Sequence, residues 1–180
     1  MYKFVVLVLL SWVLCFSVIA EEHAEKPKSP LTPEQKQTLV LELLGAFGSE
    51  LDPTDTEAVQ VAEGFILSEA SKAYAYTKLL AVPLEFCSED DGSELITAKN
   101  NYTKIAEEWI RLGEYYYNHG FSFTLGGETM GQAGEELTAE LENGVAEIRA
   151  ELVGADKATI AAKCSESIEA YNSLVGLYGG

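Results

Sequence analysis

Residues 95–119 read LITAKNNYTKIAEEWIRLGEYYYNH and have the clearest periodicity in the chain of 180 residues. Residues of the inward type recur alternately every three and four positions, at Leu95, Ala98, Tyr102, Ile105, Trp109, Leu112, Tyr116 and His119. Such a stripe lies on one face of an α-helix and is typical of the seam of a helical bundle. We therefore predict one long helix across this segment.

Two helices are predicted before this segment. Thr32-Pro33-Glu34-Gln35 carries a capping threonine, a proline at the first helical position and a glutamine that closes a capping box. The inward residues of this short helix are Val40, Leu43, Leu44 and Phe47, and Gly48 ends it. Asp52-Pro53 starts a longer helix that stops at Pro83. Its inward positions are Val59, Ala62, Ile66, Ala70, Ala73, Tyr76 and Leu80, and its many alanines allow a neighbouring helix to approach closely.

Two more helices are predicted after the segment. The fourth has the inward positions Met130, Ala133, Leu137, Leu141, Val145, Ile148 and Leu152, and Gly154 ends it. The fifth begins near Asp156 and places Ile160, Cys164, Ile168, Tyr171, Val175 and Tyr178 on one face. Phe121–Leu125 alternates like a strand, but we interpret it as a loop because an isolated strand has no partner. The expected fold of residues 32–180 is all-α, an antiparallel bundle of four long helices plus one short N-terminal helix.

The N-terminus has the pattern of a secretory signal peptide over residues 1–20. Lys3 precedes an apolar run, and Val18-Ile19-Ala20 provides the small residues before a cleavage site. The run is shorter than a membrane span, so cleavage is favoured over a membrane anchor. Lipidation at Cys15 is rejected because Leu14 precedes it. The mature chain then begins at Glu21, residues 21–31 form a flexible leader, and the location is periplasmic or extracellular.

Charge and cysteine content narrow the function further. The chain has 12 Lys and Arg against 29 Asp and Glu, a formal net charge of -17, and cleavage would remove Lys3 to give -18. This acidity argues against nucleic acid and anionic membranes and permits a cationic protein as a partner. The competing interpretation is a solvated surface, because the carboxylates are scattered along helix-like segments. Cys87 and Cys164 are the two cysteines of the mature chain, and export favours a disulfide between them. It would close a loop of about 78 residues and contribute about 4.5 kcal/mol in the chain-entropy model.

Known catalytic motifs are not present in the sequence. Di-iron sites in bundles need Glu-x-x-His pairs, and His119 has Tyr116 three residues before it. No C-x-x-C-H haem motif and no G-x-S-x-G turn occur, so we expect neither an enzyme nor a metal site. The Asn101-Tyr102-Thr103 sequon is interpreted as chance, because it falls in the middle of a predicted helix.

The segment from Tyr115 to Gly127 is the strongest candidate for a binding site. It combines aromatic rings, a histidine and glycines in one connection between helices, where proteins commonly present binding residues. Candidate ligand or interface residues are Tyr115, Tyr116, His119, Phe121, Phe123 and Met130. The competing interpretation is an apolar loop that only caps one end of the bundle.

Three classes of function follow from these observations. The first is an exported helical protein that acts by binding a protein partner without catalysis. The second is a carrier of a small apolar ligand, or of a non-covalent haem held by His119 and Met130. The third, an enzyme, is not expected. The sequence leaves the partner, the source and the oligomeric state open.

Overall fold

The computed structural model describes residues 30–46, 55–125 and 127–179. Within these ranges the chain is mostly helical, as expected for an all-α protein, and it contains one two-stranded sheet. The predicted signal peptide, residues 21–29 of the leader, and the signals at Phe47, Gly48 and Asp52-Pro53 lie outside the described residues. The elements in chain order are α2 (Pro33–Ala46), α3 (Thr56–Leu79), η1 (Val82–Glu85), α4 (Glu89–Ile105), α5 (Glu107–His119), β1 (Phe121–Leu125), β2 (Glu128–Gln132), α6 (Gly134–Leu152) and α7 (Lys157–Tyr178).

Side-chain caps fix the starts of several helices. The predicted capping box before α2 is confirmed, because the Thr32 N–H donates to Oε1 of Gln35 at 2.9 Å and the Gln35 N–H donates to the Thr32 hydroxyl at 3.3 Å. Asp156 caps α7 as expected and accepts from the Thr159 N–H at 2.8 Å. Asp55 caps α3. Each cap satisfies a backbone N–H that has no partner within its own helix.

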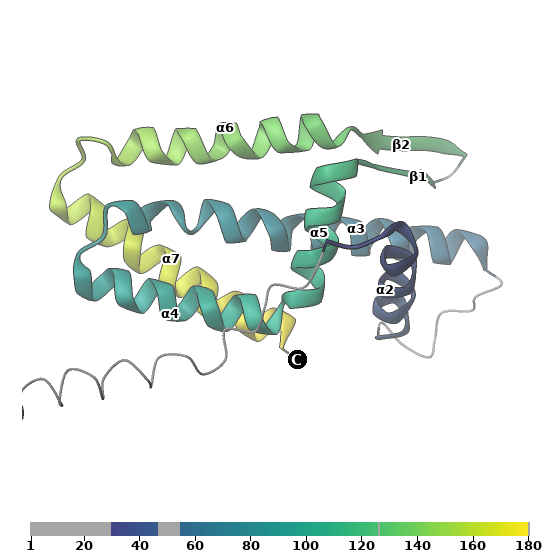
Figure 1. Ribbon diagram of the computed structural model, residues 1–180, viewed down its shortest axis with the longest axis horizontal. Helices are drawn as coiled ribbons and strands as arrows, with labels where there is room; N and C mark the ends of the chain where they lie inside the picture. The colour runs from purple at the N-terminus through teal and green to yellow at the C-terminus, as the bar shows by residue number, and fades with distance from the viewer. Residues whose placement is uncertain (1–29, 47–54, 126, 180) are drawn as a thin grey trace, which may run out of the picture.

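Helix α3 lies at the centre of the molecule. In Figure 1 α3, α4 and α6 run lengthwise, whereas α2 and α5 stand across α3, and α7 lies beside α4. The contact between α3 and α5 is the most extensive in the structure. Ala70 and Ala73 are fully buried in α3, and a Cβ added to Gly113 of α5 would collide with the Ala70 carbonyl and lie 2.7 Å from Cβ of Tyr74. The alanine-rich helix therefore does admit a close neighbour, as predicted.

The predicted continuous helix over residues 95–119 is wrong at one position. The structure ends α4 at Ile105 and starts α5 at Glu107, with the fully buried Ala106 between them. Ile105, predicted to face inward, is 41% exposed. No proline or glycine marks this break. The break arises because α5 changes direction after α4 and crosses α3. At the crossing Gly113 packs against the backbone at Ala70.

The interpretation of Phe121–Leu125 as a loop is also wrong. These residues form strand β1, which pairs in antiparallel register with β2, so that Phe123 lies opposite Met130 and Leu125 opposite Glu128. Met130 therefore belongs to a strand, and α6 begins only at Gly134. The error has one cause: the helical period predicts a fourth helix that includes Met130, whereas Met130 belongs to the partner strand. In the sequence two residues lie between Leu125 and Glu128, a connection length that is typical of tight hairpins.

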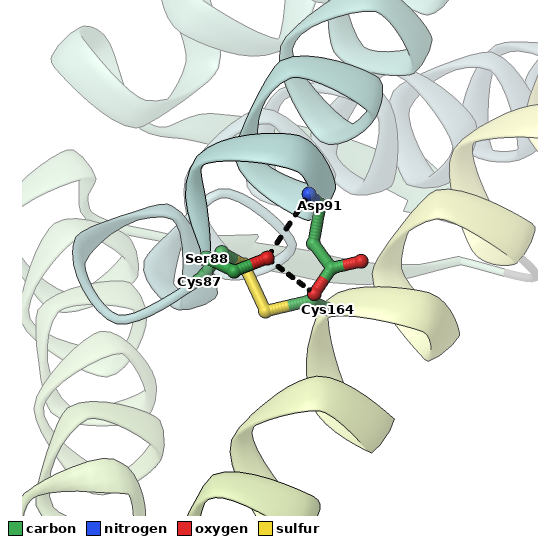
Figure 2. Close-up of a disulfide and its surroundings, with 4 residues drawn as sticks. All are labelled: Cys87, Ser88, Asp91 and Cys164. Carbon is green, nitrogen blue, oxygen red and sulfur yellow. Dashed lines mark hydrogen bonds between the residues drawn. A yellow bond between two sulfur atoms is a disulfide. The ribbon is translucent and has the colours of Figure 1, made fainter.

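A disulfide links the start of α4 to α7, as the cysteine count predicted. Cys87 and Cys164 are bonded across 77 residues of sequence, with their Cα atoms 6.0 Å apart. Figure 2 shows Ser88, the next residue, capping α4: its hydroxyl accepts from the Asp91 N–H at 3.3 Å and donates to the Asp91 carboxylate at 2.8 Å. The disulfide and the cap therefore both hold the start of α4. Cys164 is fully buried on α7.

Replacing Gly113 by Ala is expected to destabilise the fold by about 1–3 kcal/mol, because the added methyl group collides with the backbone of α3. Gly176→Ala is the matched control, since a Cβ there meets nothing within 4 Å on α7. It should be neutral or stabilise by up to about 1 kcal/mol through helix propensity. Urea unfolding measures both variants, and equal stability of Gly113→Ala and the wild type would contradict the close crossing.

Removing the disulfide in the double variant Cys87→Ala, Cys164→Ala should lower the free energy of unfolding by about 2–5 kcal/mol. Reductant should lower the stability of the wild type and leave the double variant unchanged. The intact mass of the wild type, measured with and without reductant, should differ by two hydrogen atoms. Identical masses would show that the bond does not form.

Candidate functional site

Five of the six predicted site residues line one pocket of about 420 Å³. They are Tyr115, Tyr116 and His119 from α5 together with Phe121 and Phe123 from β1. The remaining lining residues are Lys36, Gln37 and Val40 from α2, Glu63 and Leu67 from α3, and Gly120 and Ser122 from the end of α5 and from β1. These five residues are neighbours in sequence. Residues of α2 and α3, which are distant in sequence, complete the pocket around them.

Glycines direct the chain from α5 into the pocket wall. Gly120 ends α5 with φ of 74°, a left-handed conformation that favours glycine. A Cβ there would lie 2.6 Å from the carbonyl oxygen of Gln132, and a Cβ on Gly134 would lie 2.7 Å from that of Tyr117. The end of α5, the hairpin and the start of α6 are therefore packed backbone against backbone, which fixes β1 beside the pocket.

His119 is held against its own helix at the pocket. Its ring stacks on that of Tyr115, with centroids 4.3 Å apart and planes 16° apart, and its Nδ1 lies 2.9 Å from the Tyr115 carbonyl oxygen. Nδ1 carries the hydrogen if this contact is a hydrogen bond, because a carbonyl only accepts. His119 is exposed, so its predicted place on the inward stripe is wrong, and its ring forms part of the pocket surface.

Tyr116, Glu63 and Lys36 contribute polar groups to the pocket. Tyr116 is buried, and its burial raises the pKa of its phenol to about 12, with further contributions from the Glu63 and Tyr115 side chains. The phenol therefore stays protonated at neutral pH. Lys36 adds an ammonium group from α2. The pocket thus presents a hydroxyl, a carboxylate, an ammonium and an imidazole between the rings of Tyr115, Phe121 and Phe123.

Met130, the sixth predicted residue, does not line this pocket. It lies on β2 opposite Phe123 and is 40% exposed. A His–Met pair around a haem is therefore not assembled by the residues that line the pocket. Sequence reasoning also missed Lys36, Gln37, Glu63 and Leu67. Helical periodicity indicates apolar positions such as Val40, but it carries no signal for which polar side chains meet across α2 and α3.

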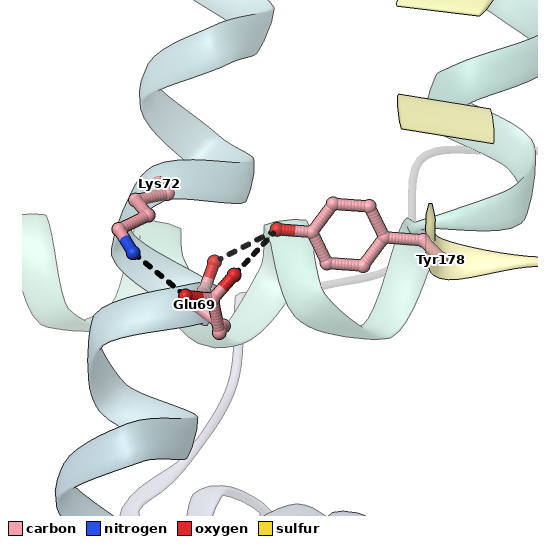
Figure 3. Close-up of polar contacts among 3 residues, drawn as sticks. All are labelled: Glu69, Lys72 and Tyr178. Carbon is pink, nitrogen blue, oxygen red and sulfur yellow. Dashed lines mark hydrogen bonds and ion pairs between the residues drawn. The ribbon is translucent and has the colours of Figure 1, made fainter. Parts of the chain in front are cut away.

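Three other tyrosines have a packing role. Tyr102, Tyr171 and Tyr178 donate their hydroxyl hydrogens to carbonyl oxygens of α3, those of Ala73 at 2.9 Å, Tyr76 at 3.0 Å and Glu69 at 3.3 Å. Figure 3 shows the Tyr178 hydroxyl directed at Glu69, whose carboxylate also pairs with Lys72 at 2.7 Å. A carbonyl oxygen has two lone pairs, so it can accept these bonds beside its helical one. These tyrosines anchor α4 and α7 to α3 and are not part of the pocket.

No group of three or more His, Cys, Asp or Glu side chains in the described part of the chain could hold a metal ion. None of the helices described is both long and apolar enough to cross a membrane. Comparison of the chain with known protein families, with curated proteins and with solved structures finds no match. The function must therefore be inferred from the pocket itself.

Burial raises the pKa values of the Tyr102, Tyr171 and Tyr178 phenols. Their stabilisation is complete below the unfolded value of about 10 and is lost as pH rises through the folded-state values. We expect the free energy of unfolding to fall steeply above about pH 10. Tyr102→Phe should cost about 1 kcal/mol at pH 8, and the difference should shrink at alkaline pH. Urea unfolding across a pH series tests this, and parallel curves would contradict it.

Proposed function

We propose that this chain is an exported helical-bundle protein that acts by binding another protein, without catalysis, at the pocket between α2, α3, α5 and β1. The observation that carries the proposal is the convergence of Tyr115, Tyr116 and His119 with Phe121 and Phe123 in one pocket. Tyrosine and other aromatic side chains are enriched in protein interfaces, where they contribute large contact areas.

Charge favours a cationic partner. The formal net charge of -17 attracts basic proteins and speeds their association. The same charge opposes nucleic acid and anionic lipid surfaces as partners. Among the described residues, Glu69, Glu85, Glu108 and Glu166 are each paired with a lysine or arginine. An ion pair is neutral as a whole, so these pairs leave the net charge of -17 unchanged.

The disulfide supports export as part of the proposal. Disulfides persist in the periplasm and outside the cell and are rare in the cytosol. The Cys87–Cys164 bond joins two elements of the helical domain, so its formation would accompany folding in an oxidising compartment. Together with the signal-peptide pattern of residues 1–20, it favours a periplasmic or extracellular site of action.

Affinity capture from the native exported fraction, followed by titration with the captured partner, tests the protein-binding function. Tyr115→Ala and His119→Ala should each weaken binding by about tenfold to a hundredfold, as interface aromatic residues do. Asn172→Ala is the control, because Asn172 lines a separate groove of about 340 Å³ between α4 and α7. Binding should also weaken with added salt. Unchanged affinity of both pocket variants would place the interface elsewhere.

A small ligand is the second candidate, because a pocket of about 420 Å³ falls within the range that small-molecule sites occupy. Native mass spectrometry of the protein purified under non-denaturing conditions would detect a bound compound, and a visible absorption band would indicate haem. A compound that is present in the wild type and lost from Tyr116→Phe would favour this candidate over a protein partner.

A further inference from the structure

Strand β1 has a free edge whose orientation follows from the hairpin register. The register pairs Leu125 with Glu128, with two residues of sequence between them. A connection of this length closes on a hydrogen-bonded pair, which assigns that role to Leu125 and Glu128. Hydrogen-bonded and non-hydrogen-bonded pairs alternate along antiparallel strands. Ser122 and Gly131 are therefore a non-hydrogen-bonded pair. A Cβ on Gly131 would lie 2.6 Å from the Phe121 carbonyl oxygen and 3.3 Å from Cα of Ser122, so the two strands approach each other closely at this pair.

The N–H and C=O groups of Ser122 consequently point away from β2. They make no hydrogen bond to another described residue outside the hairpin. Strand pairing between proteins uses groups of this kind, because each added backbone bond contributes affinity without depending on side-chain identity. A strand of five residues with one unpaired edge is thus a template for a third strand.

The free edge of β1 lies along the pocket. Four consecutive residues, Gly120 to Phe123, line the pocket, although successive side chains of a strand point to opposite faces. Contact with consecutive residues is what a cavity that runs beside the edge of a strand produces. The opposite edge, on β2, differs: Glu128 to Gly131 are all exposed and none of them lines this pocket. Of the two edges of this hairpin, the edge of β1 is therefore the one at which unpaired backbone groups lie beside the pocket.

We propose that the partner binds as an extended segment that adds a strand to the free edge of β1, with alternate side chains entering the pocket beside Tyr115 and Leu67. This inference rests on the proposed protein-binding function and names how the partner is recognised. The segment belongs to a cationic protein, because the chain's net charge is -17. Within the pocket Glu63 and Lys36 carry opposite charges, so the local specificity comes from shape and backbone pairing.

The test uses the protein expressed from its full-length sequence, and a random octapeptide library displayed on phage as the probe. Peptides selected on the wild type are synthesised and titrated against three variants. Ser122→Pro removes the outward N–H and blocks pairing, and proline is tolerated at such an edge position. Ser122→Ala removes only the hydroxyl. Thr129→Pro makes the same backbone change at an outward-facing position of β2, opposite Thr124 in the register.

The expected result is a loss of about tenfold or more in affinity for Ser122→Pro, with Ser122→Ala and Thr129→Pro unchanged. Selected peptides should be basic, and N-methylation at alternate peptide residues should abolish binding. The proposal is overturned if no peptide is enriched, if Ser122→Pro binds as tightly as the wild type, or if Thr129→Pro is the variant that fails. Circular dichroism checks that each proline variant is folded.

A second measurement does not depend on the proline variants. Hydrogen exchange of the Ser122 amide in the wild type should slow when the selected peptide is added, whereas the outward Thr129 amide of β2 should not change. Unchanged exchange at Ser122 overturns strand addition. If the natural partner loses affinity for Tyr115→Ala but binds Ser122→Pro normally, the binding function stands and only the strand-addition mode fails.

Discussion

The close crossing of α3 and α5 is the constraint on which the arrangement of this molecule depends. Gly113 lies against the backbone at Ala70, and no larger residue fits there. To reach this position α5 must leave the direction of α4, which accounts for the break at Ala106. The crossing then delivers the end of α5 to the N-terminal half of α3. Both the hairpin and the pocket are therefore consequences of one contact between small residues.

The opposite half of α3 is held by different forces. Tyrosine hydroxyls from α4 and α7 donate to three of its carbonyl oxygens, and the rings of Tyr102 and Tyr171 pack 5.4 Å apart in the same buried cluster. Phenylalanine would fill this space but could not donate these hydrogen bonds, because it lacks the hydroxyl group. This difference accounts for tyrosine at the three positions. The disulfide adds a covalent link between Cys87 and α7. Hydrogen bonds, a disulfide and the burial of apolar side chains therefore all stabilise this half.

The sequence predicts elements that local signals define, and it fails where tertiary contacts decide. The capping box at Thr32 and the cap at Asp156 are local, so the starts of α2 and α7 could be predicted. The break at Ala106 has no local signal, since its cause is the distant Ala70. The hairpin was missed because Met130 continues a helical period by coincidence. Likewise the aromatic residues of the pocket are visible in sequence, but Glu63 and Lys36 meet them only through the packing of α2 and α3.

The candidate binding site and the most strongly anchored part of the fold lie on different halves of α3. The candidate site lies against the cluster that contains Leu39, Val40 and Tyr116, to which α2 contributes apolar side chains. The described residues of this cluster include no cysteine, so the disulfide does not cross-link it. The anchored cluster around Tyr102 lies in the other half and contributes nothing to the pocket. Free energies at sites that share no partners are nearly additive. His119 and Ser122 make no described hydrogen bond or ring contact to Tyr102, Tyr171 or Tyr178. Changes at either residue should therefore alter binding more than they alter the stability of the cross-linked half.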